Sequence, residues 1–246
     1  MDGIIINFYN DGMLEMAENQ LISFKKVGIT KYISYTTGEY SYNYLKEKGY
    51  NVELYNIDKI QKELSWGCKD FIDMEKLRIK LIKDLLKKYN CVFYLDVDIV
   101  VLKNIELLLN FNTDKELIIQ NDINMPCLGC MLLFNTDNVV NMLDDFFKIE
   151  CKNSIQCYFL NYILKYKIKY TYLPLESFPN GLIFFGESNI INNSTNKMLL
   201  YKTESIRLKT KENFQNNNLY LIHANYMTGS DNKIKAFKDF NLWYLN

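Results

Sequence analysis

Residues 91–101 read Cys-Val-Phe-Tyr-Leu-Asp-Val-Asp-Ile-Val-Val, an apolar run that only Asp96 and Asp98 interrupt. The β-branched and aromatic residues of this run predict a buried strand over residues 92–101. Side chains two positions apart in a strand project from the same face, so we expect the two carboxylates to lie together. Residues 73–88, just before this strand, carry apolar side chains at helical spacing and predict a helix.

Further strands and helices alternate on both sides of this stretch. Such alternation is typical of an α/β fold with a mostly parallel central sheet flanked by helices. No Ser/Gly-rich linker or internal repeat divides the sequence, so we expect one domain over residues 1–246. The other predicted strands are 4–8, 32–35, 52–55, 117–119, 131–134 and 219–222, and the other predicted helices are 14–26, 42–48 and 155–165.

Composition excludes some classes of partner. Lys plus Arg and Asp plus Glu both total 29 in 246 residues, so no net charge attracts nucleic acid. No apolar run approaches the ~20 residues of a membrane span, and the first residues lack the pattern of a signal peptide. We therefore expect a cytoplasmic protein whose six cysteines are free thiols. The oligomeric state stays open.

The carboxylate pair needs compensation. Two like charges on an apolar element are costly, and the pKa of one carboxyl must rise unless a cation or hydrogen-bond donors offset the charge. Mn²⁺ or Mg²⁺ accepts carboxylate oxygens and is often shared with substrate phosphates, where it can neutralise a departing nucleoside diphosphate. The alternative is that one aspartate caps a turn and the other pairs with Lys or Arg. Asp-x-Asp alone leaves both interpretations open.

Three segments together resemble the nucleotide-diphospho-sugar transferase family, whose members have the glycosyltransferase A fold. They are residues 93–102, Leu-Pro-Leu-Glu-Ser-Phe-Pro-Asn-Gly at 173–181, and His-Ala-Asn-Tyr-Met-Thr-Gly-Ser-Asp-Asn-Lys at 223–233. The resemblance implies a glycosyltransferase that uses Mn²⁺ or Mg²⁺. It would move a sugar from a nucleotide-diphosphate-sugar donor to a hydroxyl of a glycan or glycoconjugate acceptor.

The same resemblance assigns roles around the metal. It implies that Asp96 and Asp98 bind the metal and the donor diphosphate, that His223 is a third metal ligand, and that Gly229 and Lys233 face the phosphates. His223 follows an apolar run, so it lies at the end of a strand, where ligands gather in α/β sheets. The alternative for this histidine, the only one in the sequence, is a packed or surface imidazole.

Other residues are placed around the donor by resemblance. Arg78 is implied to lie near the donor, and the alternative is a solvated basic helix face. Asn7, Tyr9 and Asn10 follow or end the first predicted strand, where this fold usually receives the nucleotide base and ribose. Tyr9 could stack on a base.

Asp122 and Gln156 resemble residues that line the sugar and acceptor pocket, and we assign them catalytic roles on that basis. Where the family usually shows Asp-Gln, this chain has Ile155-Gln156, and retention or inversion of the anomeric configuration stays open. Cys127 and Cys130 have the spacing of half a zinc site, but their apolar surroundings favour structural thiols.

Two other classes of protein compete with a transferase. A sugar-nucleotide pyrophosphorylase would carry a Gly-rich basic loop after the first strand, and Asn-Asp-Gly at 10–12 is not one. A non-catalytic protein that binds carbohydrate or nucleotide sugar is the other class. For a transferase, Asp96→Asn and Asp98→Asn should each abolish transfer. Because removal of one charge relieves repulsion, neither change should destabilise the metal-free protein.

Overall fold

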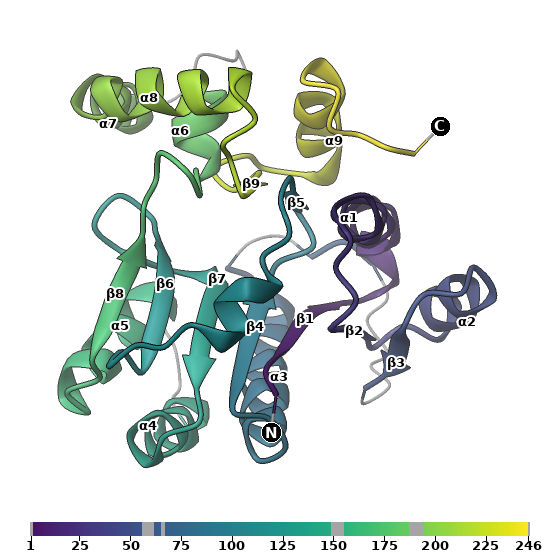
Figure 1. Cartoon of the computed structure of the whole chain (residues 1–246). Helices are drawn as coiled ribbons and strands as arrows, with labels where there is room; N and C mark the ends of the chain where they lie inside the picture. Colours follow the sequence, from purple (N-terminus) through teal and green to yellow (C-terminus); the bar gives the residue numbers. More distant parts are fainter. Residues whose placement is uncertain (1, 56–61, 65–66, 149–154, 187–193, 246) are drawn as a thin grey trace.

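The structure is a computed structural model that describes residues 2–55, 62–64, 67–148, 155–186 and 194–245. Within these residues, seven strands form one sheet in the order β3-β2-β1-β4-β7-β6-β8, and β5 pairs separately with β9 (Figure 1). The strands are β1 Ile4–Tyr9, β2 Tyr32–Thr36, β3 Val52–Leu54, β4 Cys91–Leu95, β5 Ile99–Val101, β6 Leu117–Asn121, β7 Pro126–Phe134, β8 Tyr170–Leu173 and β9 Leu221–His223. The helices are η1 Asp11–Met13, α1 Leu14–Val27, α2 Glu39–Glu47, α3 Lys69–Leu86, η2 Glu106–Asn110, α4 Asp137–Phe147, α5 Ile155–Lys165, α6 Gly181–Phe185, α7 Ser194–Lys202, α8 Glu204–Gln215 and α9 Ser230–Asp239.

The expected mostly parallel sheet is confirmed, with one reversed strand. β1 runs parallel to β2 and β4, β2 to β3, and β6 to β8, whereas β7 is antiparallel to both β4 and β6. Residues 122–125 join β6 to β7. A parallel neighbour needs a crossover of about a dozen residues or more, so this short connection requires the antiparallel pairing.

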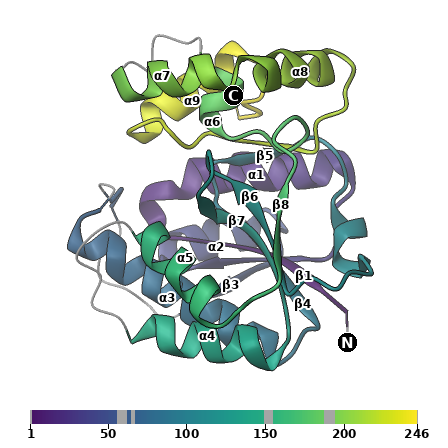
Figure 2. The same ribbon diagram turned by 90° about the vertical axis from the view of Figure 1, so that its left-hand side faces the viewer.

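Helices cover both faces of the sheet and create two hydrophobic cores (Figures 1 and 2). On one face, α3, α4 and α5 bury residues such as Ile82 and Phe159. On the other face, α1, α6 and α9 bury residues such as Phe237. Val92 and Phe93 are neighbours in β4 but contribute to opposite cores. A strand buried on both faces has no polar side, which explains the unbroken apolar run before Asp96.

The predicted strand over residues 92–101 is wrong at its centre. β4 ends at Leu95, and β5 begins at Ile99 and leaves the main sheet to pair with β9. The turn between them is closed by the Ile99 amide, which donates to the carbonyl of Asp96 at 3.2 Å. The two aspartates therefore converge because the chain turns, and not because they share one face of a strand.

The C-terminal segment returns to the first helix. Asn19 of α1 donates its side-chain amide to the carbonyl of Leu242 at 3.1 Å and accepts a hydrogen bond from the amide of Tyr244 at 2.6 Å. These bonds fasten the chain just beyond α9 to α1. Across the described residues, we find no helix with the length and apolar character needed to cross a membrane.

Candidate metal and donor site

Three potential metal ligands meet where β5 pairs with β9. Ligand atoms of Asp96, Asp98 and His223 all lie within 4.8 Å of one another. In the antiparallel ladder, His223 is the partner of Ile99, the residue that follows the aspartate turn. Its Nε2 lies 3.2 Å from Oδ1 of Asp98 and 3.9 Å from Oδ2 of Asp96. The small second sheet therefore brings a distant histidine to the two carboxylates.

These residues fit a divalent cation. Two carboxylates and one imidazole form an oxygen-rich set that suits Mn²⁺, and Mg²⁺ less well because it prefers oxygen alone. Gly129 of β7 forms one wall of the site. A Cβ at this position would lie 2.2 Å from Oδ2 of Asp96 and 2.8 Å from Cε1 of His223. Only glycine leaves the space between these ligands open.

Asp98 is a buried carboxylate that lies beside the ammonium group of Lys233 and the imidazole of His223. Its side chain is 7% exposed, and Lys233 of α9 donates to its Oδ2 at 2.7 Å. Burial acts to raise its pKa, but Lys233 and His223 outweigh burial and hold the pKa of Asp98 below its usual value. Lys233 and His223 therefore supply the compensation without which the pKa of one carboxyl is expected to rise. The ion-pair alternative describes Asp98 correctly, and the same residue also belongs to the ligand cluster.

Asp96 is oriented by its neighbours. Its Oδ1 accepts hydrogen bonds from the Tyr94 hydroxyl at 2.6 Å and from Nη1 of Arg78 at 3.1 Å, so Oδ2 is left to face His223. Arg78, on α3, is 2% exposed and also contacts Glu75. Burial is the main cause that raises the pKa of Glu75 to about 7. Arg78 therefore does not lie on a solvated helix face, and its role toward the donor stays a prediction.

The end of β1 is tied to the aspartate turn by buried amides. Asn7 donates to Oε1 of Gln20 at 2.8 Å, and Gln20 donates to the carbonyl of Asp96 at 2.6 Å. Ser34 completes the chain by donating to Oδ1 of Asn7 at 2.8 Å. Tyr9, only 2% exposed, accepts from Ser34 as well. The nucleotide-binding roles of Asn7 and Tyr9 stay predictions. In the structure, both residues belong to the hydrogen-bond network that leads to the aspartate turn.

Asn10 and Gly229 directly precede two helices, η1 and α9. Asn10 caps η1 by accepting from the amide of Gly12 at 3.1 Å, and it donates to the carbonyl of Lys62 at 2.9 Å. Gly229 precedes α9 with a φ of 82°, a conformation that favours glycine. The first amides of α9 follow it, and helix N-termini attract phosphate. The roles of Asn10 and Gly229 toward the donor stay predictions.

The two residues assigned to the acceptor side do meet. Gln156 donates to Oδ2 of Asp122 at 3.0 Å, while Asn225 and Asn180 approach Oδ1 at 3.2 and 3.5 Å. Burial is the main cause that raises the pKa of Asp122. We did not single out Asn180 and Asn225 from the sequence, although both lie in segments that carry the family resemblance. Together these side chains form one polar cluster around the Asp122 carboxylate.

The backbone beside this cluster adopts conformations that bulky residues avoid. Ile123 has a φ of 53° and Tyr226 a φ of 64°. Positive φ is a true outlier for β-branched and bulky residues, and such strain concentrates at functional sites. The two outliers adjoin Asp122 and Asn225, so the backbone gives a reason to expect a functional site here that does not depend on side-chain chemistry.

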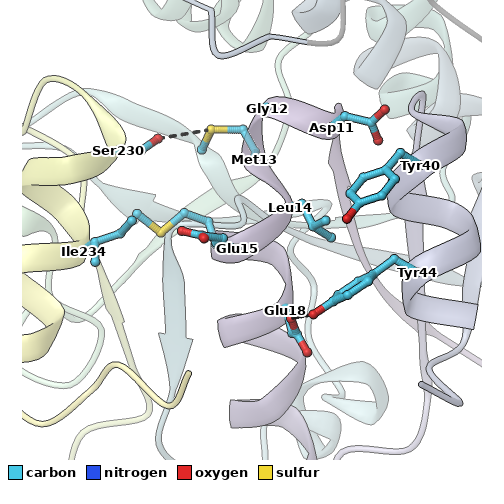
Figure 3. A pocket seen from close by; sticks show the side chains of 11 residues that line it. Asp11, Gly12, Met13, Leu14, Glu15, Glu18, Tyr40, Tyr44, Ser230 and Ile234 are labelled. Carbon is cyan, nitrogen blue, oxygen red and sulfur yellow. Dashed lines mark hydrogen bonds between the residues drawn. The ribbon is translucent and has the colours of Figure 1, made fainter. Parts of the chain in front are cut away.

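A separate cavity of about 420 Å³ lies across the first turn of α1, between α2 and α9 (Figure 3). None of the three metal-ligand residues lines it. The carboxylates of Asp11 and Glu18 both have partners, since Asp11 accepts from the amide of Ser41 and Glu18 from the hydroxyl of Tyr44. Because no metal-ligand residue lines the cavity, it is distinct from the metal cluster. Its lining residues are Asp11, Gly12, Met13, Leu14, Glu15, Met16, Glu18, Tyr40, Tyr44, Ser230 and Ile234.

The sheet has the architecture of the glycosyltransferase A fold, and the three possible metal ligands lie where β5 pairs with β9. The chain belongs to the nucleotide-diphospho-sugar transferase family, whose family model matches residues 28–237. A search of curated protein sequences found no match.

Solved structures support the fold. The chain resembles the galactosyltransferase LgtC in complex with donor and acceptor sugar analogues, with 13% identity and a TM-score of 0.54 over 98% of this chain and 95% of that one. It also resembles the glycosyltransferase GlyE of Streptococcus pneumoniae, with 14% identity and a TM-score of 0.58 over 99% of this chain. For the bifunctional glycosyltransferase WbbM, the identity is 13% and the TM-score 0.57 over 98% of this chain. The chain spans 61% of the GlyE structure and 51% of the WbbM structure.

The first prediction concerns the wall at Gly129. We expect Gly129→Ala to weaken Mn²⁺ affinity by more than about tenfold, because the new methyl group pushes Asp96 out of the ligand cluster. Titration of Mn²⁺ by isothermal calorimetry measures this, with Cys130→Ala on the same strand as a control that should keep its affinity. Normal affinity in Gly129→Ala would show that the cation is held elsewhere.

The second prediction concerns the stability of the metal-free protein. From the sequence we expect neither Asp96→Asn nor Asp98→Asn to lower it, and the contacts of Asp98 change that expectation. Asp98→Asn removes the anion beside Lys233 and leaves His223 with only the more distant Asp96, at 3.9 Å, so we expect its free energy of unfolding in EDTA to fall by roughly 3 kcal/mol. Asp96→Asn should cost less, because its carboxylate is 33% exposed and Arg78 keeps Glu75 as a partner. Urea unfolding compares the two variants. An Asp98→Asn protein as stable as wild type would contradict this account.

The third prediction concerns His223. Burial disfavours its charged form, but Asp98 raises the pKa of His223 above its usual value. A proton and a metal ion compete for Nε2, so metal affinity should fall as the pH decreases through this raised pKa. His223→Ala should weaken Mn²⁺ binding and remove most of this pH dependence. Wild-type affinity in the variant would reject the imidazole as a ligand.

Proposed function

We propose that this chain is a metal-dependent glycosyltransferase that moves a sugar from a nucleotide-diphosphate-sugar donor to a hydroxyl of a glycan or glycoconjugate acceptor. Asp96, Asp98 and His223 would hold Mn²⁺ or Mg²⁺. The observation that carries the proposal is the convergence of these three ligands within 4.8 Å beside Gly129. Family membership supports the nucleotide-sugar donor.

The donor diphosphate is proposed to lie between the ligand cluster and the first turn of α9. When bound, the cation neutralises negative charge on the departing nucleoside diphosphate. Lys233 supports this placement because its ammonium group already lies 2.7 Å from Asp98, at the edge of the cluster. The amides that follow Gly229 add donors at a helix N-terminus. Arg78 adds a further positive charge beside Asp96.

The acceptor is proposed to bind at the polar cluster around Asp122. An acceptor hydroxyl must be oriented before it attacks the anomeric carbon, and a carboxylate held by amides is a suitable acceptor for its proton. Gln156 fixes one oxygen of Asp122, while Asn180 and Asn225 approach the other. This arrangement supports positioning roles for Gln156 and the two asparagines, with Asp122 facing substrate.

The fourth prediction tests the link between metal and donor. We expect UDP, GDP or another nucleoside diphosphate to raise the melting temperature only when Mn²⁺ is present, because two carboxylates repel a diphosphate. Ligand at ~100 times its dissociation constant adds about 2.7 kcal/mol of stability. A thermal-shift screen of nucleoside diphosphates and UDP-, GDP- and CMP-sugars, with Mn²⁺ or with EDTA, identifies the base. Equal shifts under both conditions would contradict metal-dependent binding.

Turnover separates a transferase from a binding protein. A donor found in the screen is incubated with Mn²⁺, and release of nucleoside diphosphate is followed with and without candidate acceptor glycans. Transfer by wild type and its loss in Asp96→Asn and Asp98→Asn would support the proposal. Binding without release of nucleoside diphosphate in any combination would favour the non-catalytic alternative.

A further inference from the structure

Gln120 is a buried side chain that our sequence analysis did not single out, and it contacts the histidine of the metal cluster. It is 0% exposed, and its Oε1 lies 2.8 Å from Nδ1 of His223. The ladder between β6 and β7 is irregular here, since Ile119 pairs with Met131 but Gln120 pairs with Cys127. Such bulges re-aim a side chain, and this one directs Gln120 out of the main sheet toward β9.

The orientation of the Gln120 amide is fixed by its other contacts. Its Nε2 donates to the carbonyl of Phe178 at 3.0 Å and to the carbonyl of Pro179 at 3.1 Å. Backbone carbonyls only accept hydrogen bonds, so the amino group of Gln120 must face them. Its carbonyl oxygen is then the atom that faces His223. The Pro179 carbonyl also accepts from the backbone amide of His223 at 3.2 Å, which joins the two residues to the same segment.

The fixed amide determines which ring nitrogen of His223 carries a proton. An oxygen 2.8 Å from Nδ1 can only accept, so Nδ1 must donate and therefore holds a hydrogen. Nε2 lies on the other side of the ring, 3.2 Å from Oδ1 of Asp98. When Nδ1 keeps its proton, Nε2 is the nitrogen that can offer a lone pair to a metal.

We propose that Gln120 is a positioning residue that keeps a proton on Nδ1 of His223 and so reserves Nε2 for the metal. This inference rests on the proposed metal-dependent function. It also explains the segment at residues 173–181, whose carbonyls at Phe178 and Pro179 hold Gln120 in place.

Cys127 is the competing neighbour. Its thiol lies 3.7 Å from Nδ1, within reach of the same nitrogen. The Gln120 oxygen is nearer at 2.8 Å and is the stronger acceptor, so it determines the position of the proton. Cys127→Ala therefore serves as a matched control that alters the surroundings of the ring and leaves the Gln120 contact in place.

The test reads the imidazole directly. The sequence contains one histidine, so labelling with ¹⁵N-histidine gives the signals of a single ring. In metal-free wild type we expect an Nδ1–H proton that exchanges slowly with solvent. In Gln120→Met the Nδ1–H loses its acceptor, so the proton should remain only on Nε2, where Asp98 accepts it. Cys127→Ala and Gln120→Glu, which keeps an oxygen acceptor, should retain the Nδ1–H signal.

Metal affinity gives a second readout. Titration with Mn²⁺ alone should show a dissociation constant about 10–100 times higher for Gln120→Met than for wild type, the usual effect of losing an outer-shell partner. Circular dichroism verifies that each variant is folded, and Gln120→Leu, which also removes the acceptor, repeats the test if Gln120→Met is not. A protected Nδ1–H in folded Gln120→Met, or its loss in Cys127→Ala, would overturn the inference. If wild type bound no Mn²⁺ while its Nδ1–H depended on Gln120, the metal function would be wrong and the positioning role would stand.

Discussion

The negative charge of Asp98 is the constraint around which the site is arranged. A carboxylate that is 7% exposed must be compensated, and the two side chains that do so, the imidazole of His223 and the ammonium group of Lys233, come from β9 and α9, far along the chain. The amide of Ala224 also donates to the carbonyl of Asp98 at 2.9 Å, so main chain and side chain are held together. Compensation of one charge thus couples the aspartate turn to the C-terminal part of the protein.

Neutral amides surround this charged centre. Gln20 holds the carbonyl of Asp96, Gln120 holds the ring of His223, and Asn180 and Asn225 approach Asp122. An amide both donates and accepts, so it can fix two neighbours without adding charge to a site already rich in charge. The carboxylates and the imidazole are therefore oriented by groups that do not change the electrostatic balance. Such an arrangement would keep a buried site rigid and still allow it to accept the proposed cation and diphosphate.

The proposed metal site and the proposed acceptor site around Asp122 meet at His223 and β7. Gln120 contacts His223 from β6, and Asp122 directly follows the end of the same strand. Cys127 and Gly129 of β7 lie between the two groups, since Cys127 approaches both His223 and Asn225, and Gly129 faces Asp96. The short connection that reverses β7 therefore brings the proposed donor and acceptor regions within one continuous wall. The positive φ of Ile123 lies within this connection.

The sequence by itself determined the α/β alternation and the helix α5 at its true bounds, because periodicity is a local property of the chain. The grouping of Asp96, Asp98 and His223 is implied only by the resemblance of three segments to a known family, and the structure brings the three residues together. It misplaced the centre of the long apolar run, where β4 ends and β5 begins, since a buried strand and a buried turn between two strands have similar composition. Only the tertiary structure decided that Lys233 and His223 lower the pKa of Asp98, and that Gln120 faces His223. Those contacts join residues from different strands and helices, and a glutamine in a strand gives no local sign of which distant ring it will touch.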